Sequence, residues 1–210
     1  MSMPTLWTAT LDEFLSATAS AAPTPGGGSV AAVASAMGLG LILMALNVTA
    51  KKKQYPQEIS RLISGGEELL SSLKAHADKD VEIFQRYSGA LKLPKSTAAE
   101  ATSRSMALEA AAVVATEAPL AAAATALLGM RLALAASDDV VPSIISDVAC
   151  GAYTIGGGIQ GMLMTVRANI PNIHNATLVV RFRDQANQIS TESCGILDQI
   201  EQVVLHRLEV

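Results

Sequence analysis

The chain has 210 residues, of which 50% are hydrophobic but only 3% are aromatic, and its formal net charge at pH 7 is −4. A core of alanine, leucine, valine and isoleucine is typical of closely packed helices, because strands favour aromatic and β-branched residues. The acidic balance, without a basic stripe, argues against nucleic-acid binding. The length fits one domain covering residues 1–210, which is large enough to bury a substantial core.

The predicted elements are helices that follow one another along the chain. Thr10 and Glu13 form a capping-box pattern, which starts a short helix ending near residue 20. Thr97 and Glu100 form a second capping box, which opens the helix expected from about residue 98. A loop rich in proline and glycine follows. The later helices are expected over about residues 29–52, 56–93, 98–136, 143–168 and 176–207. Within them, residues 78–80 interrupt the third helix, and Pro119 kinks or divides the fourth.

The spacing of small residues indicates how these helices pack. Ala32, Ala36 and Gly40 recur at i, i+4 and i+8, and a second set with the same spacing begins at Gly157. Small side chains on one face let helix axes approach closely. We therefore predict an all-α bundle of six to seven helices with long, buried, Ala/Gly-rich members. An apolar face left over from this packing would favour a homodimer.

Residues 26–50 carry no charge and are long enough to cross a bilayer, so a membrane protein is the alternative to a soluble one. The other long apolar stretches are interrupted by charged side chains, which are costly inside a membrane. The first residues lack the pattern of a secretory signal peptide. We therefore expect a cytoplasmic protein that does not insert into a membrane.

The two cysteines, Cys150 and Cys194, are far apart in the sequence and lie in predicted helices. They are predicted to be buried, reduced thiols rather than a disulfide. The three histidines are isolated from one another, and no pair has the spacing of metal ligands. The sequence therefore predicts no metal site.

The Pro-Gly-Gly-Gly-Ser stretch at residues 25–29 stands directly before the longest apolar run. Three consecutive glycines are costly to order, so a chain keeps them where the backbone bends sharply or where another group approaches it closely. A helix that begins directly after them presents free amides and the positive end of its dipole. Gly26, Gly27, Gly28 and Ser29 are therefore either a ligand-binding loop or a tight turn between packed helices.

Asp80 is the candidate for acid–base chemistry. It shares one helix face with Phe84 and Tyr87, so its carboxylate is expected at the edge of an apolar pocket. A carboxylate in that position can give and take a proton during a reaction. The alternative is a solvated helix face with no function.

Five other polar residues have both a structural and a functional interpretation. Lys51 and Lys52 complement the dipole at a helix end, or bind the anionic tail of a ligand. Lys95 lies in a loop and is uninformative by itself. Asp147 lies in an otherwise apolar helix, so it needs an arginine or a ligand as its partner. Asn169 ends that helix, either as a cap or as a ligand-facing amide.

These segments resemble the cyclodeaminase/cyclohydrolase family of folate enzymes, which comprises the C-terminal domain of formiminotransferase-cyclodeaminase and stand-alone bacterial proteins. The matching pieces appear in the family's order and near its spacing across almost the whole chain. They are Phe14-Leu15, residues 23–29, Asn47-Val48-Thr49 with residues 51–53 and Tyr55, residues 78–84, Leu93-Pro94-Lys95, Ala118-Pro119-Leu120 and Ser146-Asp147. The glycine loop combined with Asp-x-Asp-x-x-x-Phe and Leu-Pro-Lys is far more specific than any one piece.

The resemblance implies a dimeric helical enzyme that acts on a one-carbon tetrahydrofolate and needs no metal or other cofactor. Members convert 5-formimino-tetrahydrofolate to 5,10-methenyl-tetrahydrofolate with loss of ammonia, or interconvert the methenyl and 10-formyl forms with water. Asp80 matches the family's proton-transferring carboxylate. The glycine loop, Lys51, Lys52, Lys95, Asp147 and Asn169 become candidate folate contacts, and a separate formiminotransferase becomes a candidate partner.

Two departures from the family pattern leave a second interpretation open. Val140 and Val141 stand where the family usually has Gly-Asn, and Thr165 stands where it usually has the first Asn of Asn-Val-x-x-Asn. We expect these positions to face the ligand. If they abolish turnover, the chain is a folate-binding or scaffold protein of the same fold.

Overall fold

The computed structural model describes residues 5–52 and 57–208, and within those ranges it contains α-helices and short 3-10 turns but no strand. This confirms the predicted all-α class. The α-helices are α1 (Leu11–Thr18), α2 (Gly27–Lys52), α3 (Gln57–Leu91), α4 (Ala98–Ser137), α5 (Ile145–Asn169) and α6 (Ala176–Arg207). The 3-10 turns are η1 (Leu6–Thr8), η2 (Pro142–Ile144) and η3 (Ile170–Asn172). Lys53 and Tyr55 lie outside the described residues.

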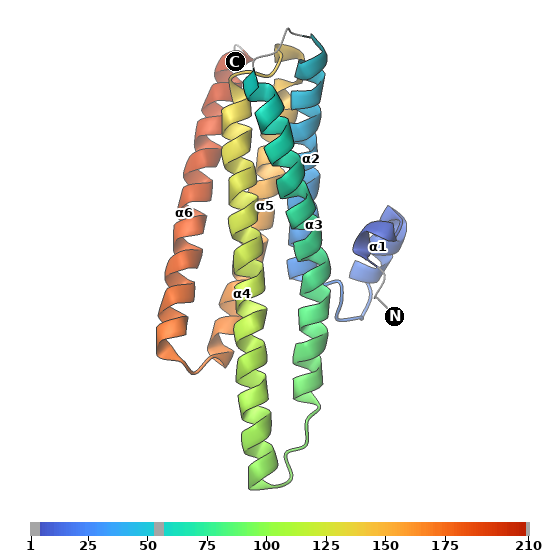
Figure 1. The fold of residues 1–210 in the computed structure, drawn as a ribbon, viewed down its shortest axis with the longest axis vertical. Helices are drawn as coiled ribbons and strands as arrows, with labels where there is room; N and C mark the ends of the chain where they lie inside the picture. The colour runs from blue at the N-terminus through green and yellow to red at the C-terminus, as the bar shows by residue number, and fades with distance from the viewer. Residues whose placement is uncertain (1–4, 53–56, 209–210) are drawn as a thin grey trace.

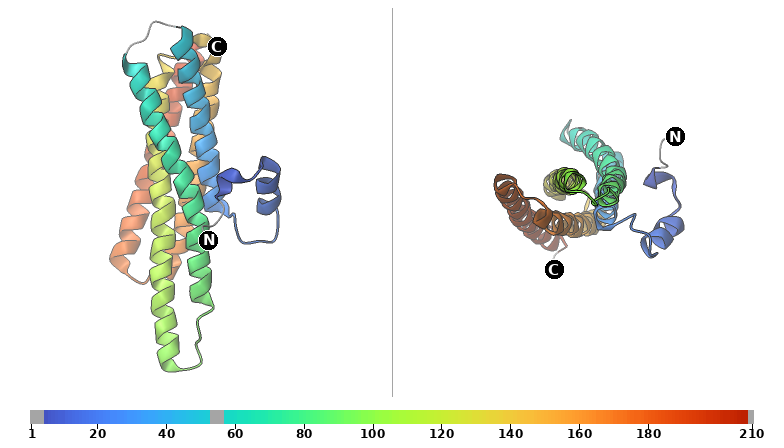
Figure 2. Two further views of the ribbon diagram at one scale, coloured as in Figure 1. Left: turned by 45° about the vertical axis from the view of Figure 1, so that its right-hand side comes forward. Right: turned by 90° about the horizontal axis from the view of Figure 1, so that it is seen from below.

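Helices α2 to α6 run lengthwise through the bundle, whereas α1 stands to one side of it near the start of α2 (Figure 1). The α3–α4 hairpin extends beyond the other helices at the lower end (Figure 2). Both predicted capping boxes are present: Thr10 with Glu13 begins α1, and Thr97 with Glu100 begins α4. These caps satisfy amides that the first turn of each helix leaves free.

Glycines let α2 and α5 cross at close range. A Cβ atom on Gly38 would lie 2.6 Å from the carbonyl oxygen of Gly151, and one on Gly151 would lie 2.6 Å from that of Gly38. A Cβ atom on Gly158 would lie 2.7 Å from the carbonyl oxygen of Ala31. The prediction of close small-residue packing holds, but Gly40 and Gly157 take no part, since an added Cβ there meets nothing within 4 Å.

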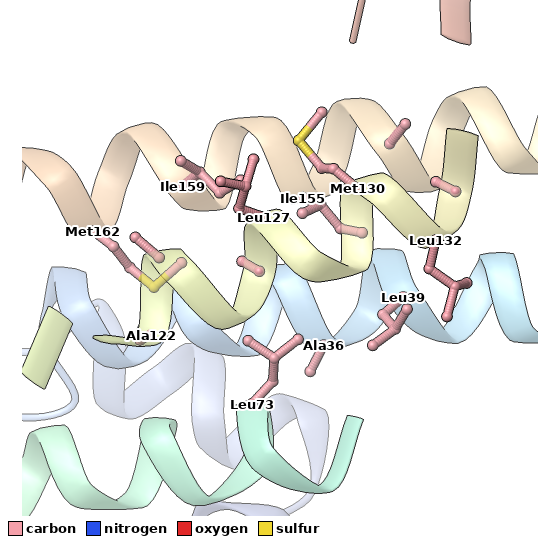
Figure 3. Close-up of a cluster of buried hydrophobic side chains, with 14 of the residues drawn as sticks. Ala36, Leu39, Leu73, Ala122, Leu127, Met130, Leu132, Ile155, Ile159 and Met162 are labelled. Atoms are coloured by element: carbon pink, nitrogen blue, oxygen red, sulfur yellow. The ribbon is translucent and has the colours of Figure 1, made fainter. Parts of the chain in front are cut away.

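The core lies between α2, α4 and α5, and α3 and α6 add side chains from either side. Figure 3 shows Leu39, Met130, Ile155 and Leu73 in this cluster, and each is fully buried. Phe182 is the one aromatic residue among the largest fully buried side chains described. Aliphatic and alanine side chains therefore form most of the core, as the composition indicates.

The helix interruption predicted at residues 78–80 is absent, because α3 continues through them. Pro119 is buried inside α4 and does not divide it. Asp78 is accommodated in α3 because it accepts hydrogen bonds from Thr5 Oγ1, at 2.5 Å, and from the Leu6 amide, at 2.8 Å. Polar residues in this stretch thus mark a contact with the N-terminal arm rather than a helix end.

The prediction for the cysteines is wrong in one respect: Cys150 and Cys194 are both exposed, although both lie in helices. The buried positions of α5 beside Cys150 are Gly151 and Ala152, which face the core.

Helices α2 and α4 are long and apolar enough to cross a membrane by length and composition. In this fold, 61% of the most hydrophobic window of α2 and 44% of that of α4 is buried.

Candidate functional site

A pocket of about 330 Å³ opens where α2 begins, beside the C-terminal half of α3 and the end of α5. We call it the Asp80 pocket. Its lining residues come from the glycine loop and from α2, α3, α4 and α5. They are Pro23, Thr24, Gly26, Gly27, Gly28, Asp80, Ile83, Phe84, Tyr87, Ala115, Thr165 and Asn169.

Asp80 is held in this pocket by the start of α2. The buried Ser29 hydroxyl donates a hydrogen bond of 2.7 Å to Asp80 Oδ2. The backbone of Gly28 packs directly against the same carboxyl group, because a Cβ atom on Gly28 would lie 2.3 Å from Asp80 Oδ1. The close approach that the glycine run predicts is therefore at Gly28. At Gly27 an added Cβ would meet only Thr165 Oγ1, at 4.0 Å.

The first turn of α2 adds a favourable field to this contact. The first helical hydrogen bond of α2 runs from the Val30 amide to the Gly26 carbonyl, at 3.0 Å. The amides of residues 27–29 therefore have no carbonyl partner within the helix. They lie at the positive end of the α2 dipole, where a carboxylate is stabilised. The glycine loop thus has two roles in this fold: it starts α2 and it packs against Asp80.

Apart from Asp80, the wall of the pocket that α3 forms is mainly apolar. Ile83, Phe84 and Tyr87 follow Asp80 at i+3, i+4 and i+7, which places them on one face of α3. Ile83 is buried, and Phe84 is 38% exposed. The sequence identifies Phe84 and Tyr87 by this spacing, whereas Ile83 fits the same pattern and was not singled out.

The last turns of α5 complete the pocket. Asn169 Nδ2 donates a hydrogen bond of 2.7 Å to the carbonyl oxygen of Ala115 on α4, and Thr165 Oγ1 donates to the Gly161 carbonyl, at 3.3 Å. Thr165 is one of the residues that line the pocket, as expected. Val140 and Val141 are not: both are buried before α5, and the Val141 amide bonds Thr49 Oγ1 at 3.0 Å.

Four of the candidate folate contacts lie away from this pocket. Lys51 and Lys52 end α2, about 36 Å from Gly27 at the rise of an α-helix. Asp147 lies in the first turn of α5, near the same end, where Lys52 Nζ approaches Ser143 Oγ at 3.4 Å. Lys95 lies in the exposed α3–α4 loop at the lower tip of the molecule in Figure 1. One chain does not bring these side chains to Asp80.

The N-terminal arm, residues 5–7, packs against α3 close to Asp80 in the sequence, a contact that the sequence did not predict. Besides its bonds to Asp78, the arm places Trp7 Nε1 3.0 Å from the carbonyl oxygen of Lys74, which accepts its hydrogen bond. The Lys74 ammonium lies over the Trp7 ring, 5.2 Å from its centre. Asp78 and Asp80 therefore differ in role: the first binds the arm, and the second faces the pocket.

Two other features do not join the site. His76 Nε2 lies 3.1 Å from Thr125 Oγ1, and burial lowers the pKa of this imidazole, with a smaller effect from the Lys79 charge. His76 is not part of the Asp80 pocket lining. In residues 5–52 and 57–208, no group of three or more acidic, histidine or cysteine side chains is arranged to hold a metal ion.

A larger groove of about 580 Å³ lies between α4 and α6. Its floor is apolar, and its charged side chains are paired across the two helices. Arg131 bonds Glu192, and Arg181 Nη2 lies 3.0 Å from Glu117 Oε1. Because these acids are already neutralised by arginines, the smaller pocket with Asp80 is the better candidate for acid–base chemistry.

The model of the formiminotransferase-cyclodeaminase family matches residues 10–188. The chain belongs to this family. A methenyltetrahydrofolate cyclohydrolase of Methylorubrum extorquens is 28% identical over 198 residues, which cover 93% of this chain and 95% of the relative. The crystal structure of a formiminotetrahydrofolate cyclodeaminase from Thermotoga maritima matches with a TM-score of 0.83 and 24% identity, over 94% of this chain and 96% of that one. The second likeness shows that the two proteins share a fold.

Proposed function

We propose that this formiminotransferase-cyclodeaminase family member opens or closes the one-carbon bridge between N5 and N10 of a tetrahydrofolate, with Asp80 moving the proton. The observation that carries the proposal is the Asp80 carboxylate, bonded by Ser29 at 2.7 Å in a pocket with an apolar wall. Family membership and the name of the cyclohydrolase relative support the substrate class.

Ring closure of 5-formimino-tetrahydrofolate needs one proton removed and one added. The formimino group reacts in its protonated form, –CH=NH2+. N10 attacks its carbon, and the N10 proton passes to Asp80. The protonated Asp80 then delivers that proton to the NH2 group, which leaves as ammonia while the cationic 5,10-methenyl bridge forms. One carboxylate can therefore serve both steps, first as a base and then as an acid.

Hydrolysis of the methenyl bridge uses the same group. Water attacks the bridging carbon, and Asp80 takes a proton from that water. The bond between the carbon and N5 then breaks, and N5 receives the proton from Asp80. The hydroxyl group on the carbon releases its own proton to solvent and becomes the formyl oxygen, so 10-formyl-tetrahydrofolate and one proton result. Ser29 occupies Oδ2, so Oδ1 is the oxygen left for the moving proton in either reaction.

The dimensions of the pocket suggest how the folate lies. About 330 Å³ is at the small end of ligand pockets. The reacting ring and its one-carbon group therefore lie inside, against Phe84 and Tyr87, while the glutamate tail extends out of the pocket. This orientation requires cationic groups outside the pocket mouth.

The decisive experiment follows the ultraviolet absorbance of 5,10-methenyl-tetrahydrofolate. We expect the protein to accelerate either its formation from 5-formimino-tetrahydrofolate or its hydrolysis, and the two assays distinguish cyclodeaminase from cyclohydrolase. Binding of folate without either rate would support the non-catalytic alternative that Thr165 raises. Absence of both binding and turnover would overturn the proposed function.

We also propose that the enzyme is a homodimer formed through the outer face of α2. Met37 and Met44 are 54% and 37% exposed on the part of α2 that precedes Lys51, which carries no charge, and Leu11 and Leu15 of the neighbouring α1 are also exposed. Gly40 lies between the two methionines, and nothing in its own chain needs a glycine there. A close approach by a second α2 would explain both features.

An antiparallel pair of α2 helices crossing at Gly40 would supply the missing cations. Gly40 is midway between Gly27 and Lys52, so the lysines of one subunit would lie beside the glycine loop of the other. The glutamate tail leaving one pocket would then meet Lys51 and Lys52 of the partner. Asp147, at the same end of the bundle, would approach that pocket too.

Replacing Met44 by glutamate is expected to convert the dimer into a monomer and to raise KM for the folate, because the partner's lysines are lost. Light scattering after gel filtration measures the mass, and Val180→Glu, a similar change on an exposed residue of α6, should remain dimeric.

The double variant Lys51→Ala/Lys52→Ala should raise KM without changing the mass. A monomeric wild-type enzyme with full activity would refute this arrangement.

A further inference from the structure

Helix α4 continues for 40 residues although Pro119 lies inside it. Proline has no amide hydrogen, and its ring pushes against the carbonyl group four residues earlier. In α4 that carbonyl belongs to Ala115, which therefore lacks its helical donor. Ala115 lies in the wall of the Asp80 pocket. A carbonyl left without a donor inside a protein is costly, so another group is expected to bond it.

That group is the side-chain amide of Asn169, the last residue of α5. Its Nδ2 atom donates to the Ala115 carbonyl oxygen at 2.7 Å, across 54 residues of sequence. A carbonyl oxygen can only accept, so this contact determines which end of the amide is the nitrogen. Pro119 and Asn169, on two different helices, therefore meet through one main-chain oxygen.

The bond leaves the other end of the amide available. Within residues 5–52 and 57–208, the Nδ2 bond is the only hydrogen bond of the Asn169 side chain. In that part of the chain, every side-chain nitrogen or oxygen that is inaccessible to solvent has a hydrogen-bond partner. Asn169 Oδ1 has no partner there, so it must be accessible to solvent. Because Asn169 lines the Asp80 pocket, Oδ1 can accept a hydrogen bond from a ligand there.

We propose that Pro119 is a positioning residue: by depriving the Ala115 carbonyl of its helical donor, it turns the Asn169 amide so that Oδ1 accepts a hydrogen bond from an N–H group of the bound heterocycle. The identity of this ligand as a tetrahydrofolate rests on the proposed function. The contact between Pro119, Ala115 and Asn169 does not. Pro119 thereby acts on the pocket through the side chain of another helix.

A purely structural role would have different consequences. If the Asn169 bond only ties α5 to α4, removing it changes stability and leaves the affinity for ligand unchanged. If the bond orients Oδ1, removing it weakens binding in a fold that remains intact. The experiment therefore needs a structural readout on the amide and a separate measurement of binding.

The test variant is Pro119→Ala. Alanine restores the amide hydrogen at position 119, which draws the Ala115 carbonyl back toward the helix axis and away from Asn169. Two-dimensional NMR should then show a shift of the side-chain amide signals of Asn169, assigned by their loss in Asn169→Asp. The Kd for 5-formyl-tetrahydrofolate should rise about fivefold, the size expected for one neutral hydrogen bond.

A double-mutant cycle makes the result specific. Asn169→Ala should weaken binding by about tenfold in the wild type and by clearly less in Pro119→Ala, because the amide is then already misplaced. Pro142→Ala, the same change at the far end of α5, should leave the Asn169 signals and the Kd unchanged. Circular dichroism should show equal helix content in all variants.

Two results would overturn the inference. One is a Pro119→Ala protein with wild-type Asn169 signals and a wild-type Kd, and the other is an Asn169→Ala effect that is equal in both backgrounds. Failure of the proposed function looks different. In that case the wild-type protein binds no tetrahydrofolate, while the NMR comparison of wild type and Pro119→Ala still decides whether Pro119 positions the amide.

Discussion

Replacing Asp80 by asparagine is expected to lower kcat by about a thousandfold, within the range that a positioned acid–base group supplies. Asparagine has nearly the same shape, and its Oδ1 atom can still accept the hydrogen bond from Ser29. It cannot take up and release a proton, so the loss should appear in turnover and not in folding. The assay is the ultraviolet rate for the methenyl compound, with circular dichroism and mass as checks.

The matched control for this variant lies two residues away on the same helix. Asp78 is bonded by Thr5 and by the Leu6 amide, so Asp78→Asn should loosen the N-terminal arm and retain most of the activity. Equal loss of activity in both variants would mean that the pair acts through the arm and not through proton transfer. Full activity in Asp80→Asn would remove the proposed mechanism.

The part of the site that sequence reasoning predicts is the part that depends on local spacing. Asp80, Phe84 and Tyr87 share a pocket wall because residues at i, i+4 and i+7 share a helix face. The glycine loop meets Asp80 because three glycines before a helix indicate a close approach. The helical class followed in the same way, from an aliphatic composition and two capping boxes.

The length of α2 separates residues that the sequence assigns to one site. The glycine loop and Lys51 are both candidate contacts for one ligand, but they begin and end the same helix and lie about 36 Å apart. The same applies to Asp147 and Asn169 at the two ends of α5. Candidate residues at opposite ends of one helix therefore imply either two sites or a second subunit.

Other features depend on how helices are rotated against each other, which no local pattern states. Cys150 was expected inside, but α5 turns Gly151 and Ala152 toward the core and leaves the thiol exposed. Pro119 was expected to kink or divide a helix, and the bond that satisfies the freed carbonyl comes from Asn169 on another helix. Neither outcome could be derived without the packing of α4 and α5.

Replacing Gly28 by alanine is expected to lower kcat by about a hundredfold, the loss that a misplaced reacting group can produce. The added methyl group would lie 2.3 Å from Asp80 Oδ1 and 2.7 Å from Asp80 Cγ, so the two groups cannot keep their positions. The atoms that must move are the end of a side chain and not backbone. The fold should therefore survive while the carboxylate leaves its place beside Ser29.

Two other glycines separate this effect from a general loss of stability. Gly195→Ala on α6 meets nothing within 4 Å, so it should leave activity unchanged and raise the melting temperature slightly, because alanine favours the helix over glycine. Gly38→Ala would place its methyl group 2.6 Å from the backbone oxygen of Gly151, so it should destabilise the fold by about 1–3 kcal/mol. Gly28→Ala should combine a melting temperature near that of Gly195→Ala with the greatest loss of turnover of the three. If it retains wild-type turnover, Asp80 does not need its position beside the start of α2, and the proposed mechanism loses its geometric basis.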